Sequence, residues 1–75
     1  MFTLSQVEPG KRVKIVSLVG GRGLHGRLVN MGMIPGSTIE VVGQGMNGPR
    51  IVTHNGCRLA IGRGVARKII VSDLS

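Results

Sequence analysis

Two side chains that could bind a metal flank a turn in this sequence. His54 and Cys57 lie on either side of Asn55-Gly56, the dipeptide most typical of a two-residue type I′ hairpin. In such a hairpin His54 faces Cys57, which makes the pair weak candidates for a metal site. A structural zinc site takes four ligands, and the only other histidine is His25. We therefore expect no metal and no cofactor, with His54 and Cys57 packed at the edge of the core.

The sequence signals for a nucleotide-binding site or a catalytic site are weaker than the signal for a metal site. Residues 21–26 read G-x-G-x-x-G, but a dinucleotide-binding unit also needs a long helix and a parallel second strand. No acidic residue lies near His54 in the sequence to orient it, and no nucleophile elbow is present. The sequence therefore predicts a protein that is not an enzyme.

The charge balance favours an acidic partner. Ten Lys and Arg residues against three acids give a net charge of +7, which suits nucleic acid, an anionic membrane surface or an acidic protein. Single-stranded RNA binders stack bases on aromatic side chains, and proline-rich peptides bind aromatic-lined grooves. Phe2 is the only aromatic residue here, so a protein-docking module is the better interpretation. Seven of the ten basic residues form two groups, Lys11, Arg12 and Lys14 near the first strand and Arg58, Arg63, Arg67 and Lys68 near the C-terminal strands.

The segment from Leu24 to Val41 predicts a helix, a stop, a turn and a strand. Leu24, Leu28 and Met31 recur at helical spacing, which predicts that they face the core. Gly32 suits the left-handed residue after a helix, and Pro35-Gly36 suits a type II turn. Ile39 and Val41 then alternate with polar residues, as in a half-buried strand.

The rest of the chain predicts short strands joined by tight turns. Pro9-Gly10 and the alternating Val13 and Ile15 repeat the pattern of Pro35-Gly36 with Ile39 and Val41, which indicates two equivalent strand entries. The remaining expectations are a capping box over 5–8, a first strand to about Leu18, loops over 20–23 and 43–48, strands over 50–54 and 57–61, a tight turn over 62–66 and a last strand over 68–71.

These elements predict one domain, residues 1–75, that is mostly β. The expected fold is a small SH3-like β-barrel of about five strands, with one short helix inserted in the first long loop. The single cysteine suits a reducing compartment, and neither a long apolar run nor a signal peptide is evident, so we expect a cytoplasmic protein. Exposed loops carry binding functions disproportionately, so Arg22, His25, Arg27 and Met33 are the candidate partner-binding residues.

The sequence resembles the FeoA family in its most specific stretch, Arg27-Leu28-x-x-Met31-Gly32-Met33-x-Pro35-Gly36. The resemblance covers nearly the whole chain. It implies an SH3-like accessory protein of bacterial ferrous iron uptake, with the membrane transporter FeoB and its cytoplasmic GTP-binding domain as partner. It supplies no catalytic residue. Two other hypotheses remain: an RNA-binding small barrel, favoured by the net charge, and a metal-sensing regulator that uses His54, Cys57 and His25.

Overall fold

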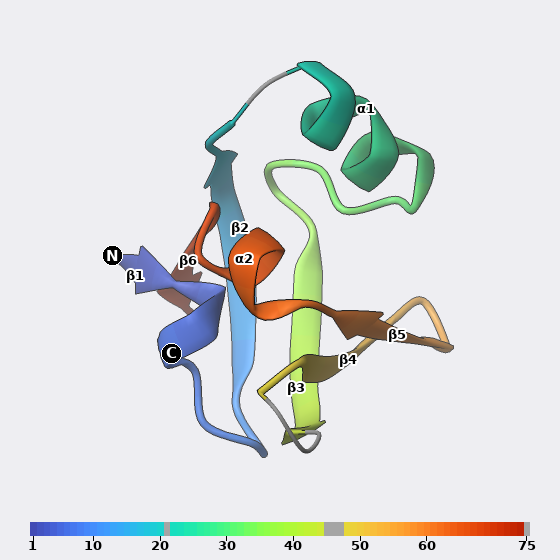
Figure 1. The fold of residues 1–75 in the computed structure, drawn as a ribbon. Coiled ribbons are helices and arrows are strands. Elements are labelled where there is room, and N and C mark those ends of the chain that lie inside the picture. Colours follow the sequence, from blue (N-terminus) through green and yellow to red (C-terminus); the bar gives the residue numbers. More distant parts are fainter. Residues whose placement is uncertain (21, 45–47, 75) are drawn as a thin grey trace.

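The computed structural model describes residues 1–20, 22–44 and 48–74, without the side chains of Arg22, Leu24 and His25. Six strands form one antiparallel sheet in the order β1-β6-β2-β3-β4-β5 (Figure 1). The elements are β1 (Phe2–Thr3), η1 (Leu4–Gln6), β2 (Arg12–Leu18), α1 (Arg22–Asn30), β3 (Thr38–Gln44), β4 (Arg50–His54), β5 (Cys57–Ile61), α2 (Arg63–Ala66) and β6 (Ile69–Asp73).

The predicted fold class is confirmed, with α1 inserted between β2 and β3 at one end of the sheet (Figure 1). The sheet has six strands because the two-residue β1 pairs with β6. Within the described part of the chain, none of the helices has the length and apolar character needed to cross a membrane.

The two predicted strand entries are equivalent in three dimensions. Gly10 and Gly36 both have a positive φ, 96° and 95°, after their prolines. The Gly10 N–H donates to the Val41 carbonyl at 2.6 Å, and the Gly36 N–H donates to the Ile15 carbonyl at 2.8 Å. Each turn therefore hydrogen-bonds to the strand that follows the other turn, and a local two-fold axis passes near the Val13–Ile39 pair.

The equivalence extends to a bulge in each strand. The register of β2 against β6 shifts between Ile15 and Ser17, and that of β3 against β4 shifts between Val41 and Gly43. Val16 and Val42 are thus the extra residues, and both are exposed, by 37% and 38%. Because bulges increase strand twist and bend the strand, the paired bulges curve the sheet on both sides of the β2–β3 ladder.

Helix α1 ends as the sequence predicts, at a glycine in the left-handed region. Gly32 has a φ of 81°, and its N–H donates to the Val29 carbonyl at 2.9 Å. The Met33 N–H donates to the Leu28 carbonyl, also at 2.9 Å. These two bonds define a Schellman motif, which satisfies carbonyls that the helix end would otherwise leave unpaired.

The β4–β5 hairpin is confirmed in both turn type and register. Asn55 and Gly56 have φ values of 52° and 81°, as a type I′ turn requires. His54 pairs with Cys57, Thr53 with Arg58, and Val52 with Leu59. This register turns Val52, Leu59 and Ile61 to one face, where Val52 and Ile61 are buried and Leu59 is half-buried.

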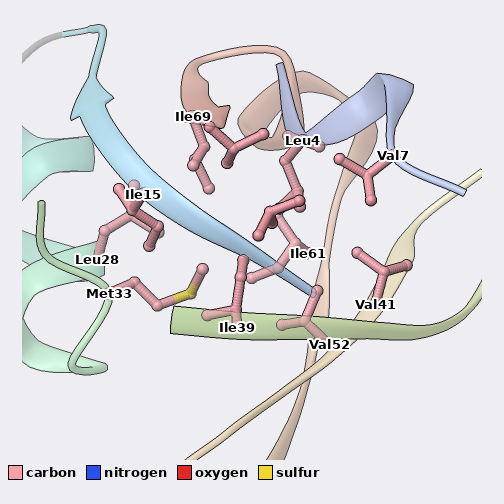
Figure 2. Close-up of a cluster of buried hydrophobic side chains, with 13 residues drawn as sticks. Leu4, Val7, Ile15, Leu28, Met33, Ile39, Val41, Val52, Ile61 and Ile69 are labelled. Carbon is pink, nitrogen blue, oxygen red and sulfur yellow. The ribbon is translucent and has the colours of Figure 1, made fainter. Parts of the chain in front are cut away.

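The core is aliphatic, and its side chains come from the strands, the helices and the N-terminal segment. Figure 2 shows Leu28 and Met33 approaching from the α1 side, Ile15, Ile39 and Val41 from the central strands, and Leu4 and Val7 from the N-terminal segment. Ala66 and Ile69 add the α2 side. Each part of the chain therefore contributes apolar surface to a single cluster, whose burial is the main stabilising term for so small a domain.

Four local predictions are wrong. Of the loop expected over 20–23, α1 takes residues 22 and 23. The N-terminal turn begins after Thr3, whose N–H donates to Gln6 Oε1 at 3.0 Å, so the expected capping box over 5–8 does not form. Burial of Leu4 and Val7 fixes this earlier start. Strand β6 begins at Ile69 because the Lys68 N–H still donates to the Val65 carbonyl in the α2 turn. Of the loop expected over 43–48, β3 takes residues 43 and 44, and residues 45–47 lie outside the description.

Replacing Gly32 by Val is expected to destabilise the protein. A β-branched residue is strained at a φ of 81°, and a Cβ there would lie 3.2 Å from His54 Nε2. We expect a loss of about 2 kcal/mol of unfolding free energy, or about 10 °C in Tm. Gly26→Ala is the control: its Cβ would meet nothing within 4 Å in mid-helix, so it is expected to stabilise by up to about 1 kcal/mol. An unchanged Tm for Gly32→Val would contradict the left-handed helix end.

Candidate partner-docking site

The segment from α1 to the start of β3 forms a compact unit that projects from one end of the sheet (Figure 1). We call residues 22–37 the helix–turn unit. The Ser37 N–H donates to the Ile34 carbonyl at 3.0 Å, which closes the type II turn around Pro35-Gly36. The Ser37 hydroxyl also donates to the Gly32 carbonyl at 3.1 Å and accepts from the Ile34 N–H at 3.4 Å. These bonds hold the turn against the helix end.

A small cleft separates the helix–turn unit from β5 and α2. Its volume is about 120 Å³, which is small for a drug-sized ligand but suits a single side chain of a partner. The cleft combines apolar walls with one guanidinium at its edge. Its lining residues are Arg27, Leu28, Met31, Ala60, Ile61, Gly62 and Val65.

The outer surface of the helix–turn unit carries several exposed apolar side chains. The exposed apolar side chains are Val29, Met31 and Ile34, and Arg27 in the same unit is exposed as well. Aliphatic and methionine side chains beside an arginine are usual at protein–protein contacts, and methionine adapts readily to different partners. The surface is therefore chemically suited to docking a protein.

The structure changes which methionine is available for contact. Met33 was expected to be exposed and Met31 to be in the core, but Met33 has no exposed surface and Met31 is 38% exposed. The prediction that Met33 is a surface contact is therefore wrong. The reason is the Schellman motif, in which the residue after the left-handed glycine bonds back to the helix and packs on the residue five positions before it, here Met33 on Leu28 (Figure 2).

The other predicted residues are only partly placed. Leu28 is buried as expected, and Arg27 is exposed at the cleft. Arg22 and His25 belong to α1, but their side chains, like that of Leu24, lie outside the description. Sequence reasoning missed Ala60, Gly62 and Val65, which reach the cleft only through the tertiary fold. The exchange of Met31 and Met33 could have been inferred from Gly32, because a glycine after a helix is a signal for the Schellman motif.

His54 links the hairpin to the helix–turn unit. Its Nδ1 lies 3.2 Å from the Thr38 carbonyl oxygen, and its Nε2 lies 3.3 Å from Asn55 Nδ2. A carbonyl can only accept, so these contacts fit the tautomer with the proton on Nδ1. The ring also packs on Gly32, where a Cβ would lie 3.2 Å from Nε2. His54 therefore has the half-buried position at the core edge that the hairpin pattern predicts.

Cys57 differs from its partner across the hairpin. Its side chain is exposed and not part of a disulfide, so the prediction that Cys57 packs at the edge of the core is wrong. Within residues 1–20, 22–44 and 48–74, no three His, Cys, Asp or Glu side chains come together in a way that could hold a metal ion. His25, the third residue of the metal-sensor hypothesis, has no described side chain, so that hypothesis stays a prediction.

The fold and the inserted helix define a small SH3-like domain. A solved Stenotrophomonas maltophilia FeoA, described as a prokaryotic SH3 domain protein and complexed with zinc, superposes with a TM-score of 0.80. It is 22% identical, and the match covers 96% of this chain and 91% of that one, which supports the fold alone.

The family follows from sequence similarity. The FeoA domain model matches residues 2–73. A Methanocaldococcus jannaschii protein named "Putative Fe(2+) transport protein A" is 40% identical over 73 residues, covering 97% of this chain and 88% of its own. A crystal structure described as the iron uptake regulatory protein FeoA is 38% identical with a TM-score of 0.88, covering 97% of this chain and 96% of the other. The chain belongs to the FeoA family.

The two sides of the His54–Cys57 pair are expected to respond differently to substitution. His54→Ala removes the contact to the Thr38 carbonyl and the packing on Gly32, so we expect a loss of about 1–2 kcal/mol of unfolding free energy. Cys57→Ser changes an exposed side chain and should alter stability by less than about 0.5 kcal/mol. Urea unfolding of both variants is the measurement, and equal effects would contradict the linking role of His54.

Proposed function

We propose that this protein is a non-enzymatic cytoplasmic accessory of ferrous iron uptake. It docks on the cytoplasmic, GTP-binding part of a FeoB-like membrane transporter and modulates the assembly or activity of that transporter. It reaches the membrane only indirectly, through this partner. The observation that carries the proposal is the projecting helix–turn unit with its cleft and exposed Met31 and Arg27, in a chain of the FeoA family.

The surface chemistry supports protein docking through this unit. The cleft offers an apolar site bordered by a cation, and the flanking Val29 and Ile34 extend the apolar area. A partner side chain seated between α1 and α2 would contact both the helix–turn unit and the hairpin. The net charge of +7 would attract an acidic partner surface and raise the association rate at low salt. Arg22 and His25 remain further candidate contacts on α1.

The same charge favours RNA binding as the second candidate function. Binding that rests on phosphate contacts would weaken steeply with salt and depend on the number of cations rather than on the cleft. A chain with one aromatic residue lacks the stacking surface of single-stranded RNA binders. Substitution of cleft residues therefore distinguishes the two functions, because it should weaken docking of a protein but not charge-based binding of RNA.

Met31→Glu is expected to weaken binding to the isolated cytoplasmic domain of the transporter by about tenfold or more, because it places a charge in the apolar cleft. Val42→Glu is the matched control, since both side chains are 38% exposed but Val42 is on β3, away from the lining residues. Binding would be measured by a salt-titrated pull-down with total RNA as competitor. Recovery of RNA without the transporter domain would contradict the proposal.

Arg27→Glu tests the contribution of charge at the same place. Arg27 is exposed and lines the cleft. Arg58 is also exposed, but it lies on β5 and does not line the cleft. We expect Arg27→Glu to weaken docking more than Arg58→Glu, although the two changes alter net charge identically. Equal losses in the same pull-down would show that overall charge, not the cleft, governs the interaction.

A further inference from the structure

A second, larger cleft lies where the N-terminal turn, the end of β3 and α2 meet. Its volume is about 480 Å³, within the range of small-molecule sites. Its lining is Ser5, Gln44, Gly48, Arg50, Arg63 and Arg67. Half of these residues are arginines, and they come from β4 and the α2 region, which are separate in the sequence. The fold therefore concentrates positive charge that the linear sequence distributes over 18 positions.

Arg50 is anchored at this cleft by neutral groups. Its Nη2 donates to the Ser5 backbone carbonyl, and its Nη1 donates to Gln44 Oε1 at 3.1 Å. A guanidinium carries five N–H donors, so these bonds hold the group without using its remaining donors or its charge. An arginine fixed in this way is ordered before a ligand arrives, which lowers the entropy cost of binding.

The side chain of Arg63 packs against Gly48, where a larger residue would take its place. A Cβ at Gly48 would lie 2.4 Å from Arg63 Cδ and 2.8 Å from Cγ, closer than real side chains approach. Gly48 also has a positive φ of 91°. Arg67 follows Arg63 by one helical turn, and its N–H donates to the Arg63 carbonyl at 3.2 Å. The α2 turn thereby brings Arg63 and Arg67 to the same cleft.

The cleft has no neutralising acid among the described residues. Glu8 and Asp73 line a different cleft together with Lys11, and Glu40 lies in β3 opposite Arg12 and Thr53. Three arginines that share one cleft repel one another, and an anion with several oxygens relieves that repulsion. Guanidinium groups bind phosphate through paired, charge-assisted hydrogen bonds.

We propose that this cleft is a binding site for a soluble small molecule that carries two adjacent phosphate groups. Pyrophosphate has a charge of about −3 near neutral pH, because a terminal phosphate contributes about −1.5 to −2. That charge balances Arg50, Arg63 and Arg67. The cleft volume accommodates two phosphates and leaves space for the organic part of a diphosphate ester. The proposal is independent of docking through the helix–turn unit.

Calorimetric titration with pyrophosphate, and with inorganic phosphate for comparison, tests the site on the full chain. We expect one pyrophosphate per chain, bound more tightly than inorganic phosphate. Arg67→Gln should weaken binding by about tenfold or more, as loss of a charge-assisted hydrogen bond does. Arg58→Gln, which removes the same charge from β5 outside the cleft, should change the affinity by about twofold or less. Equal losses in the two variants would overturn the proposal.

Gly48→Ala tests the geometry of the cleft without a change in charge. The added Cβ must displace Arg63, so we expect weaker pyrophosphate binding. Gly10→Ala is the control for backbone strain, because Gly10 has a similar φ of 96° but nothing within 4 Å of the added atom. Thermal unfolding would establish that both variants fold. If Gly48→Ala does not fold, Arg67→Gln still tests the site. Unchanged pyrophosphate affinity in folded Gly48→Ala would overturn the proposal.

The same titration distinguishes the source of the phosphate. Vesicles with phosphatidic acid and a single-stranded RNA are tested beside pyrophosphate at matched ionic strength. Saturable pyrophosphate binding that is lost in Arg67→Gln supports a soluble diphosphate ligand. Binding to vesicles or RNA without saturable pyrophosphate binding would overturn the proposal, since the three arginines would then bind a membrane surface or a nucleic acid.

Discussion

The left-handed conformation of Gly32 is the constraint on which the helix–turn unit depends. It allows Gly32 and Met33 to bond back to α1, which turns the chain sharply and buries Met33 beside Leu28. The same absence of a side chain lets the His54 ring approach closely, so the hairpin packs against the helix end. One backbone conformation therefore fixes where α1 ends, which methionine enters the core and where the β4–β5 hairpin is held. The small cleft between α1 and the β5–α2 region lies beside this packed helix end.

The sheet beneath this unit is organised by the related turns at Gly10 and Gly36. Their reciprocal hydrogen bonds to Val41 and Ile15 align β2 and β3, and the bulges at Val16 and Val42 bend both strands at equivalent places. Such a curved sheet surrounds an aliphatic core even though the chain has a single aromatic residue. In a domain of this size each buried side chain is a large share of the total stability. The central ladder thus provides the rigid base from which α1 projects.

The two clefts give the molecule surfaces of different chemistry. The smaller one, between α1 and the β5–α2 region, is mainly apolar with one arginine at its edge. The larger one, beside the N-terminal turn, is polar and contains three arginines. α2 contributes to both, with Val65 in the first and Arg63 in the second. A single helical turn therefore lies between the surface proposed for a protein partner and the surface proposed for a diphosphate.

Local chemistry by itself determined the turns and the strand register. Pro-Gly and Asn-Gly dictate positive φ at Gly10, Gly36 and Asn55-Gly56, and a two-residue hairpin leaves one register for His54 and Cys57. Only the tertiary structure decided which side chains share a surface. Met31 and Met33 exchange places because the chain folds back after Gly32. Arg50 joins Arg63 and Arg67 because β4 begins at the cleft that α2 also lines, whereas Arg58 lies outside that lining. Turn preferences act over a few residues, whereas a cleft needs several distant segments to pack together, and that packing is not encoded in any short pattern.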